Sequence, residues 1–354
     1  MNGMSRFLRR QLEAEPPLQP AAHAGAWARL ITPALLILLL LVTLLSLSIG
    51  STAVAVWAGL LDFFSGRQSL DAIVVGDIRL PRTLIALAVG AALGLSGAAL
   101  QGLLRNPLAE PGLTGASQGA ALGAASVFYF GLFPALGTAA PSVAGLIGAA
   151  VALVLMLALA GSARSHMVIM AGLAISTLCG AALATVLNFA PNPYAMQELV
   201  FWLLGSVSER GMEHLWLLLP ALLVGAALIM SQRRLLSGLS LGDQVARSMG
   251  LNYRYGSIMI VLGAALLVGS SVAVAGSIGF VGLLVPHLLR PLVQYRPERL
   301  LVPAALAGAI LVCWADIFVR LLPPGRELKL GVLTSLLGAP LFIWLVWKER
   351  KQWN

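Results

Sequence analysis

Apolar residues dominate the chain and fall in ten long stretches separated by short polar segments. Each stretch has about 16 to 22 residues, the length that a helix needs to cross a hydrocarbon core about 30 Å thick. The longest apolar run, 256–293, exceeds one crossing, and we divide it at Gly276-Ser277-Ile278-Gly279, which is expected to form a tight turn. The pattern predicts spans at 33–50, 83–104, 113–131, 143–161, 167–187, 214–231, 256–276, 278–293, 300–321 and 331–347.

The second predicted span has a stripe of very small side chains. Four of them recur at every fourth position: Gly90, Gly94, Ala98 and Gly102. Residues four apart share one helix face, so another helix's backbone can approach closely along this stripe. Pro81 suits the first turn of this helix, and Asn106-Pro107 is expected to end it. The sequence therefore predicts that this span lies inside a helical bundle.

Composition sets the class of protein. Of the 354 residues, 59% are hydrophobic and only 10% are charged, and the mean hydropathy is +0.90. These values predict an all-α polytopic membrane protein. Cys179 and Cys313 each lie in an apolar stretch, which excludes a disulfide framework and gives no metal-ligand spacing. The net charge of +9 comes from scattered basic residues, so we interpret it as a topology signal and not as a nucleic-acid surface.

Charge also predicts the orientation in the membrane. With the amino terminus inside, the cytoplasmic segments collect 16 of the 23 Lys and Arg residues, and the opposite face keeps 7. Ten spans then leave both termini in the cytoplasm. The chain divides into a cytoplasmic tail at 1–29, a transmembrane domain at 30–347 with a cytoplasmic loop at 237–254, and a second tail at 348–354. The basic start resembles a signal peptide, but its Pro-containing spacer and missing cleavage pattern favour a retained first span.

A weak internal similarity is compatible with an inverted repeat of two five-helix halves. The segments GAALGLSGAALQG at 90–102 and GAALLVGSSVAVAG at 263–276 fall on the second and seventh spans. An offset of five spans would make them run in opposite directions. Similar matches also arise by chance in sequences rich in Ala, Gly and Leu.

The sequence lacks the motifs that would supply energy for transport. The spans hold almost no ionisable residues, apart from Asp316 and Arg320, which are four residues apart and can pair on one helix face. No Gly-rich phosphate loop ending in Gly-Lys-Ser or Gly-Lys-Thr occurs. If transport is active, its energy must come from another subunit.

Two other function classes have weaker support. An ion-coupled secondary transporter would need ionisable coupling sites within the spans. A membrane-embedded enzyme would need clustered acidic or histidine side chains. The four histidines do not cluster in the predicted topology: His23, His166, His214 and His287.

The cytoplasmic loop at 237–254 is the best candidate for contact with such a subunit. Ser240, three residues before Asp243, gives it a start like a capping box, and Gly250 is a good stop signal. The sequence predicts a short helix outside the membrane. Its functional interpretation is a coupling helix gripped by a cytoplasmic partner, and the alternative is an ordinary connecting helix.

Five ordered motifs resemble the permease subunits of bacterial ABC importers for iron-siderophores, haem and vitamin B12, the FecCD permease family. The motifs cover about three-quarters of the chain: IRLPRTLIALAVGAALGLSGAALQGLLRNPLAEPGLTGASQGA at 78–120, FWLLGSV at 201–207, LGDQVARSMGL at 241–251, AGSIGFVGLLVPHLLR at 275–290 and ADIFVRLLPPGRELKLGVLTSLLGAPLFIWL at 315–345.

The resemblance implies a passive transport subunit in the bacterial inner membrane, with no ATPase motifs of its own. The implied partners are a second permease subunit, expected to form a homodimer, two ATP-binding subunits and a periplasmic substrate-binding protein. ATP and Mg would be used by the partner ATPase, and no cofactor or metal is expected on this chain. The cargo expected from the family is an iron chelate, a ferric siderophore or haem, with cobalamin (vitamin B12) as the alternative.

The resemblance also implies roles for individual residues. Arginines on the periplasmic rim would pair with acidic side chains of the binding protein, and arginine suits this because its planar fork binds carboxylates bidentately. These are Arg79, Arg82 and Arg320. Their alternative roles are anchoring to lipid headgroups for the first two and pairing with Asp316 for the third. Coupling to the ATPase would involve Gly242, Asp243, Arg247 and Gly250, and the cytoplasmic gate Ser165 and His166.

Four further residues complete the predictions. His287, in a Val-Pro-His sequence, is interpreted as structural, although haem ligation by His287, Met167 or Met170 is an alternative. Lys329 departs from the family pattern, which usually has a proline just before Gly331. It would add positive charge near the docking surface.

Overall fold

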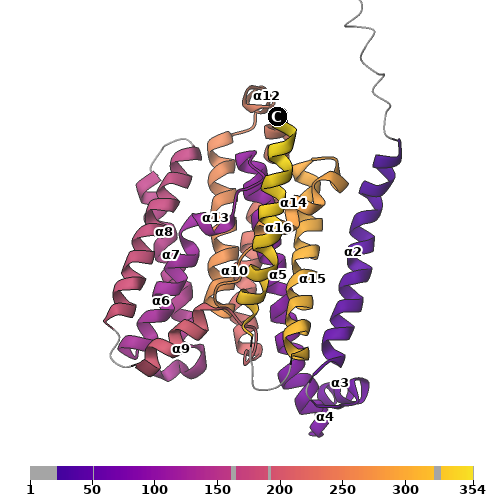
Figure 1. The fold of residues 1–354 in the computed structure, drawn as a ribbon, viewed down its shortest axis with the longest axis vertical. Helices are drawn as coiled ribbons and strands as arrows, with labels where there is room; N and C mark the ends of the chain where they lie inside the picture. The colour runs from indigo at the N-terminus through magenta and orange to yellow at the C-terminus, as the bar shows by residue number, and fades with distance from the viewer. Residues whose placement is uncertain (1–21, 51, 161–164, 190–192, 323–327, 354) are drawn as a thin grey trace, which may run out of the picture.

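The structure of the chain, a computed structural model, describes residues 22–50, 52–160, 165–189, 193–322 and 328–353. In this part of the chain every regular element is helical (Figure 1). Most of the predicted tail at 1–29 and the last residue lie outside the described residues. The first long helix begins at Ala22, inside the segment predicted as a tail. The Ala-rich sequence there favours helix.

A helix occupies each of the ten predicted spans. These are α2 (Ala22–Ser48), α5 (Leu80–Leu104), α6 (Ala116–Phe130), α7 (Ala140–Ala160), α8 (Ser165–Asn188), α10 (Met212–Ser231), α13 (Tyr253–Ala275), α14 (Val281–Leu289), α15 (Pro297–Leu321) and α16 (Leu330–Trp353). Seven apolar stretches of the described chain are long enough to cross a membrane; the predicted spans outside this set correspond to α6, α14 and α16. The chain is therefore an all-α polytopic membrane protein.

Short helices join these long ones. They are α3 (Val56–Phe64), α4 (Leu70–Ala72), η1 (Ile73–Arg79), η2 (Pro111–Thr114), η3 (Pro134–Ala139), α9 (Pro193–Leu203), α11 (Arg233–Ser240), α12 (Asp243–Ser248) and η4 (Pro291–Val293). The segment η1 is a π-helix that leads directly into α5.

The short helices distinguish the two ends of the bundle. Figure 1 shows α12, the start of α2 and the end of α16 at one end, which we call the α12 end. It shows α3, α4 and α9 at the opposite end, which we call the α9 end. The start of α2 and the end of α16 thus share one end, as the predicted topology requires.

The centre of the bundle is built from α5 and α13. In each, 78% of the most apolar window is buried, against 17% for α2 at the edge of the bundle. The two central helices run in opposite directions between the two ends (Figure 1). This direction agrees with the inverted repeat predicted from 90–102 and 263–276, while the repeat itself stays a prediction.

The small-residue stripe of α5 lies against α15. A Cβ added to Gly94 would lie 2.1 Å from the Ala304 carbonyl oxygen, and one added to Gly90 would lie 2.3 Å from the Gly308 carbonyl oxygen. Ala98 is fully buried, and a Cβ on Gly102 would come within 3.0 Å of Pro297 at the start of α15. The two backbones are therefore too close for larger side chains.

A second close contact of α5 was not predicted. A Cβ added to Gly97 would lie 1.8 Å from the Gly282 carbonyl oxygen of α14. Gly97 is three residues from Gly94, so α5 presents small residues to α15 and α14 on neighbouring faces. The sequence signal was present, since Gly97 lies within GLSGAALQG.

The predicted tight turn between the seventh and eighth spans is instead a five-residue non-helical segment, 276–280. It leaves α14 with only 9 residues, about 14 Å of helix, which is too short to cross a bilayer alone. The backbone around this break pairs with other elements: Ser206 N donates to Ala275 O (2.7 Å), Ser277 N to Leu203 O (3.3 Å) and Gly331 N to Gly205 O (3.2 Å). Non-helical backbone at membrane depth is tolerated where protein satisfies its polar groups.

Candidate functional site

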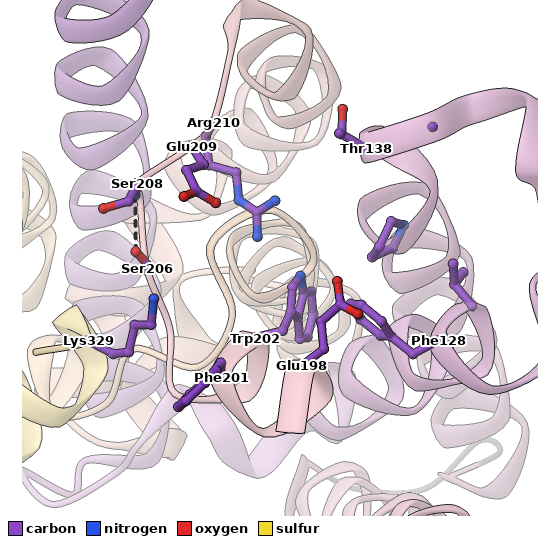
Figure 2. Close-up of a pocket in the computed structure, with 13 residues that line it drawn as sticks. Phe128, Thr138, Glu198, Phe201, Trp202, Ser206, Ser208, Glu209, Arg210 and Lys329 are labelled. Atoms are coloured by element: carbon purple, nitrogen blue, oxygen red, sulfur yellow. Dashed lines mark hydrogen bonds between the residues drawn. The ribbon is translucent and has the colours of Figure 1, made fainter. Parts of the chain in front are cut away.

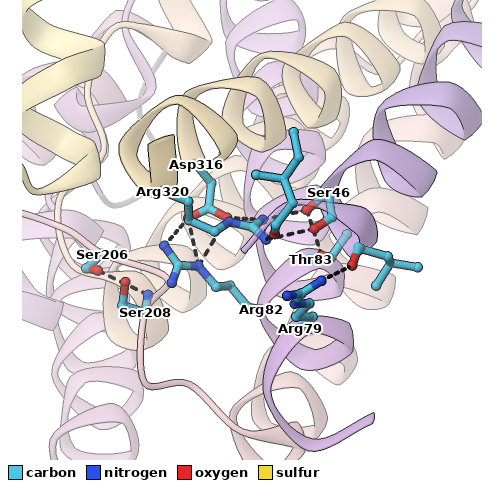
Figure 3. Close-up of polar contacts among 10 residues, drawn as sticks. Ser46, Arg79, Arg82, Thr83, Ser206, Ser208, Asp316 and Arg320 are labelled. Atoms are coloured by element: carbon cyan, nitrogen blue, oxygen red, sulfur yellow. Dashed lines mark hydrogen bonds and ion pairs between the residues drawn. The ribbon is translucent and has the colours of Figure 1, made fainter. Parts of the chain in front are cut away.

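The predicted docking arginines lie near one another at the α9 end, where Arg82 and Arg320 bind one buried carboxylate (Figure 3). Arg82, in the first turn of α5, donates to Asp316 Oδ1 from Nη2 (2.8 Å) and Nε (3.0 Å), and to Oδ2 from Nε (3.2 Å). Arg320, one turn after Asp316 on α15, donates to Oδ2 from Nη2. Asp316 is only 1% exposed. The pairing of Arg320 with Asp316 is the alternative that the sequence analysis gave for this arginine.

The same arginines also hold the end of α2. Arg79 Nη1 donates to Leu47 O (2.9 Å) and Ser48 O (3.1 Å), and its Nη2 to Thr52 O. Arg320 Nη1 donates to Ser46 O (2.8 Å) and Ile49 O (3.1 Å). The last carbonyls of a helix have no intrahelical donor, and a cation there interacts favourably with the helix dipole. Arg79 and Arg320 therefore cap the carboxyl end of α2.

The cluster carries a net positive charge. It contains three guanidinium groups and one carboxylate, which binds Arg82 and Arg320, so the excess is two positive charges. Arg79 is 4% exposed, and the side chains of Arg82 and Arg320 are 18% and 7% exposed. The α2 carbonyl partners of Arg79 and Arg320 were not predicted, because backbone carbonyls carry no sequence signature.

The predicted coupling segment is two helices and not one. Ser240, predicted to begin a helix, lies at the end of α11 and donates to Ser237 O (2.7 Å). The next helix, α12, begins after Gly242, whose φ of 110° breaks the chain between the two helices. The capping-box prediction for Ser240 is therefore wrong, because a glycine turn lies between Ser240 and Asp243. The side chain of Asp243 lies outside the described part.

The predicted stop at Gly250 is present in the structure. Gly250 has φ of 73°, its N donates to Arg247 O (3.0 Å), and Leu251 N donates to Ala246 O (3.3 Å). These two bonds form a Schellman motif, which ends a helix at a residue with positive φ. The motif fixes the end of α12 against α11, where Ala246 is fully buried beside Gly238.

Three exposed apolar side chains lie on and beside α12, and we call them the exposed stripe. Leu241 caps the end of α11, Val245 lies on α12 and Met249 follows its last residue; they are 66%, 40% and 57% exposed. Arg247 is exposed on the last turn. Apolar side chains gathered outside the bundle are typical of a surface that another protein covers. The sequence analysis did not single out this stripe.

The remaining predicted residues are more scattered. Ser165 and His166 begin α8, but their side chains lie outside the described part. His287 lies on α14. Lys329 Nζ is 5.8 Å from the ring centroid of Phe201, a cation–π distance. Among the described residues, no group of three or more His, Cys, Asp or Glu side chains could hold a metal ion.

A cavity of about 600 Å³ opens at the α9 end, and we call it the α9 cavity (Figure 2). It lies between α6, η3, α9 and the loop at 204–211. Its lining combines aromatic rings with charged and hydroxyl side chains: Val127, Phe128, Gly137, Thr138, Pro141, Glu198, Phe201, Trp202, Ser206, Ser208, Glu209, Arg210 and Lys329. Sequence reasoning missed it, because these residues come from four separate segments.

Arg210 lies in the loop that forms one wall of the α9 cavity. Burial lowers the pKa of its guanidinium group, while the charges of Glu209 and Glu213 raise that pKa. Removal from water disfavours the charged form of this side chain, and the two neighbouring carboxylates partly offset that cost.

Comparisons with known proteins assign the chain to a family. Residues 38–348 match the FecCD transport family. The vitamin B12 import system permease protein BtuC of Salmonella paratyphi A is 40% identical over 320 residues, covering 89% of this chain and 94% of that protein. BtuC of Citrobacter koseri is 39% identical over 320 residues, covering 89% and 93%.

A solved structure agrees with these relatives. An ABC transporter assigned to the metal-chelate type, in an inward-facing conformation, matches with a TM-score of 0.76 and 31% identity, covering 90% of this chain and 99% of that chain. An importer of this family works in the bacterial inner membrane with ATPase and substrate-binding partners, and the ATPase hydrolyses the ATP. The chain belongs to the FecCD transport family and is a membrane-spanning permease subunit of an ABC importer.

Proposed function

We propose that the cargo of this permease is vitamin B12. The observation that carries this proposal is the name shared by relatives about 40% identical over nearly their whole length. The sequence analysis favoured an iron chelate because that is the commoner cargo of the family. That interpretation gains no specific support from the relatives, so the cobalamin alternative becomes the main hypothesis.

In the proposed assembly, two copies of the chain enclose a central pathway. Two ATPase subunits bind at the α12 end, and one binding protein docks at the α9 end. ATP binding and hydrolysis would select outward-facing and inward-facing states through a rigid-body change. Walls of small and apolar side chains would let a bulky chelate pass without retaining it, and Ser165 and His166 would lie at the inner gate.

The exposed stripe of Leu241, Val245 and Met249 supports the coupling role of the 237–254 segment. An ATPase groove that covers these side chains would grip α12, and Arg247 beside them would pair with an acidic residue at its rim. The segment is held to the bundle through buried Ala246, so movement of the ATPase would reach α11 directly.

The net charge of the arginine cluster supports docking at the α9 end. Two excess positive charges would attract acidic side chains of a binding protein. Arg82 is the best candidate for direct pairing, since it is the most exposed of the three guanidinium groups. Arg79 and Arg320 would act mainly by holding α2 and Arg82 in position, with Lys329 adding a further positive charge.

The test is ATP-dependent uptake by proteoliposomes that contain the permease, its ATPase and the binding protein. We expect uptake of radiolabelled cyanocobalamin that requires ATP, and none of haem or ferric siderophores offered with their own binding proteins. Uptake of an iron chelate instead of cyanocobalamin would overturn the cargo. Uptake that follows an ion gradient without the ATPase would overturn the whole mechanism.

A further inference from the structure

The α9 cavity contains a hydrogen-bond donor that the protein leaves without an acceptor. Trp202 is only 8% exposed, and its Nε1–H has no hydrogen-bond partner within the described chain. Figure 2 shows the indole nitrogen directed into the cavity. An unpaired buried donor has lost its hydrogen bonds to water and gained none in return, which is unfavourable. Such groups are rare in native structures, and a bound ligand that accepts this hydrogen bond would remove the cost.

A second unpaired donor lies across the cavity. Arg210 Nε also has no hydrogen-bond partner within the described chain, and its guanidinium group points into the same space in Figure 2. Trp202 comes from α9 and Arg210 from the loop that follows it. Two donors on different walls, both directed inward, indicate a site for a ligand that has acceptor atoms.

The charges around the cavity limit the kind of ligand. Glu198 and Glu209 supply two carboxylates, and Arg210 and Lys329 supply two cations. The lining therefore has no net charge. A neutral ligand with both donors and acceptors fits such a lining better than a strongly anionic chelate does. A carboxamide has this character, because its oxygen accepts and its NH₂ group donates two hydrogen bonds.

The apolar part of the lining is aromatic. Phe128, Phe201 and Trp202 provide flat faces beside the polar groups. The volume of about 600 Å³ lies in the range of small-molecule sites. A corrin macrocycle is larger than this, so only one edge of it would enter, and that edge carries carboxamide side chains.

We propose that the α9 cavity binds the carboxamide-bearing edge of the cargo before it enters the pathway, an inference that rests on vitamin B12 being the cargo. Trp202 Nε1 and Arg210 donate to amide oxygens, and Glu198 accepts from amide NH₂ groups. The cavity is a transient recognition site at the outer mouth, separate from the arginine cluster that faces the binding protein.

The test measures equilibrium binding of radiolabelled cyanocobalamin to the permease–ATPase complex in nanodiscs without the binding protein. Trp202→Phe keeps the ring and removes the donor, so we expect affinity to fall about 5- to 10-fold, the usual effect of one hydrogen bond. Trp216→Phe is the matched control, because Trp216 on α10 is 64% exposed and does not line the cavity. Its affinity should equal that of the wild type.

A change in the ligand combined with a change in the protein tests the site further. The expected result is a gain in affinity, which misfolding would not produce. A cyanocobalamin derivative with one carboxamide hydrolysed to a carboxylate should bind the wild type more weakly than cyanocobalamin. Glu198→Gln removes one negative charge from the lining, so it should bind this derivative more tightly than the wild type does. Glu198 is exposed, so this substitution should not disturb folding.

Three results would overturn the cavity proposal: no binding of cyanocobalamin to the wild type, equal affinities of Trp202→Phe and Trp216→Phe, or an effect of Trp202→Phe on binding-protein docking alone. ATP-driven uptake of cyanocobalamin, measured on the same preparation, tests the cargo separately. Uptake with an unaffected Trp202→Phe variant would reject only the cavity, whereas lack of uptake would reject the cargo.

Discussion

At the scale of single residues, Asp316 organises the α9 end of the bundle. One buried carboxylate accepts hydrogen bonds from Arg82 and Arg320, and Arg320 in turn caps α2. The hydroxyl of Ser46 lies 2.8 Å from that of Thr83, which links α2 to α5 in the same network. Three helices thus depend on a charge that has almost no contact with solvent.

Replacing this carboxylate should be costly. Asp316→Asn leaves two guanidinium groups without a counter-charge, and loss of one partner from a buried ion pair typically destabilises by about 3–5 kcal/mol. We expect a marked fall in the midpoint of thermal unfolding of the detergent-solubilised complex. Asp62→Asn is the control, because its pair with Arg67 is 3.7 Å long and the Arg67 side chain is 78% exposed. That variant should lose less than about 1 kcal/mol, and equal losses would contradict the role of Asp316.

At the scale of elements, the contact between α5 and α15 depends on the absence of side chains. Gly90 and Gly94 face backbone atoms of α15 at distances that no real Cβ adopts. Packing of this kind joins membrane helices where no hydrophobic effect operates between them. Backbone atoms cannot move aside as a flexible side chain can, so the interface should tolerate no added volume.

Gly94→Ala tests this interface. The new methyl group would meet the Ala304 carbonyl, and overpacking of this kind costs about 1–3 kcal/mol. We expect lower thermal stability and a smaller yield of folded protein. Gly180→Ala on α8 is the control, since a Cβ there would meet nothing within 4 Å. It should be neutral or more stable, because alanine exceeds glycine in helix propensity by about 1 kcal/mol. A neutral Gly94→Ala variant would contradict the close approach.

The end of α12 gives a second prediction at this scale. Gly250 and Gly66 have nearly equal φ values, 73° and 72°, and both have open space around them. Alanine at either position should cost on the order of 1 kcal/mol of strain. If α12 transmits the ATPase motion, only Gly250→Ala should reduce ATP-driven uptake, by about 5-fold for 1 kcal/mol of lost coupling. Equal uptake by the two variants would contradict the coupling role.

At the scale of the whole molecule, the apolar stretches were sufficient to predict the bundle. Each predicted span contains a helix, because about 20 consecutive apolar residues are stable in a bilayer only with their backbone hydrogen bonds closed. The break at 276–280 was harder to predict, since its backbone and that of the preceding Ala275 are paired by a segment distant in the sequence, through Leu203 and Ser206. Local sequence patterns could not predict two other features for the same reason. The partners of Arg79 are backbone carbonyls, and the residues that line the α9 cavity come from separate segments of the chain.

The orientation of the whole chain gives the last prediction. Positive charge predicts that the α12 end faces the cytoplasm, and the structure offers an exposed serine at each end, Ser240 on α11 and Ser65 after α3. The native cysteines are buried, Cys179 at 8% and Cys313 at 0% exposed, so a wild-type control should react little with a membrane-impermeant maleimide. We expect Ser65→Cys to be labelled in intact spheroplasts and Ser240→Cys only after the membrane is permeabilised. The reverse result would put α12 on the side away from the cytoplasmic ATPase, and the coupling mechanism would then have no physical contact through which to act.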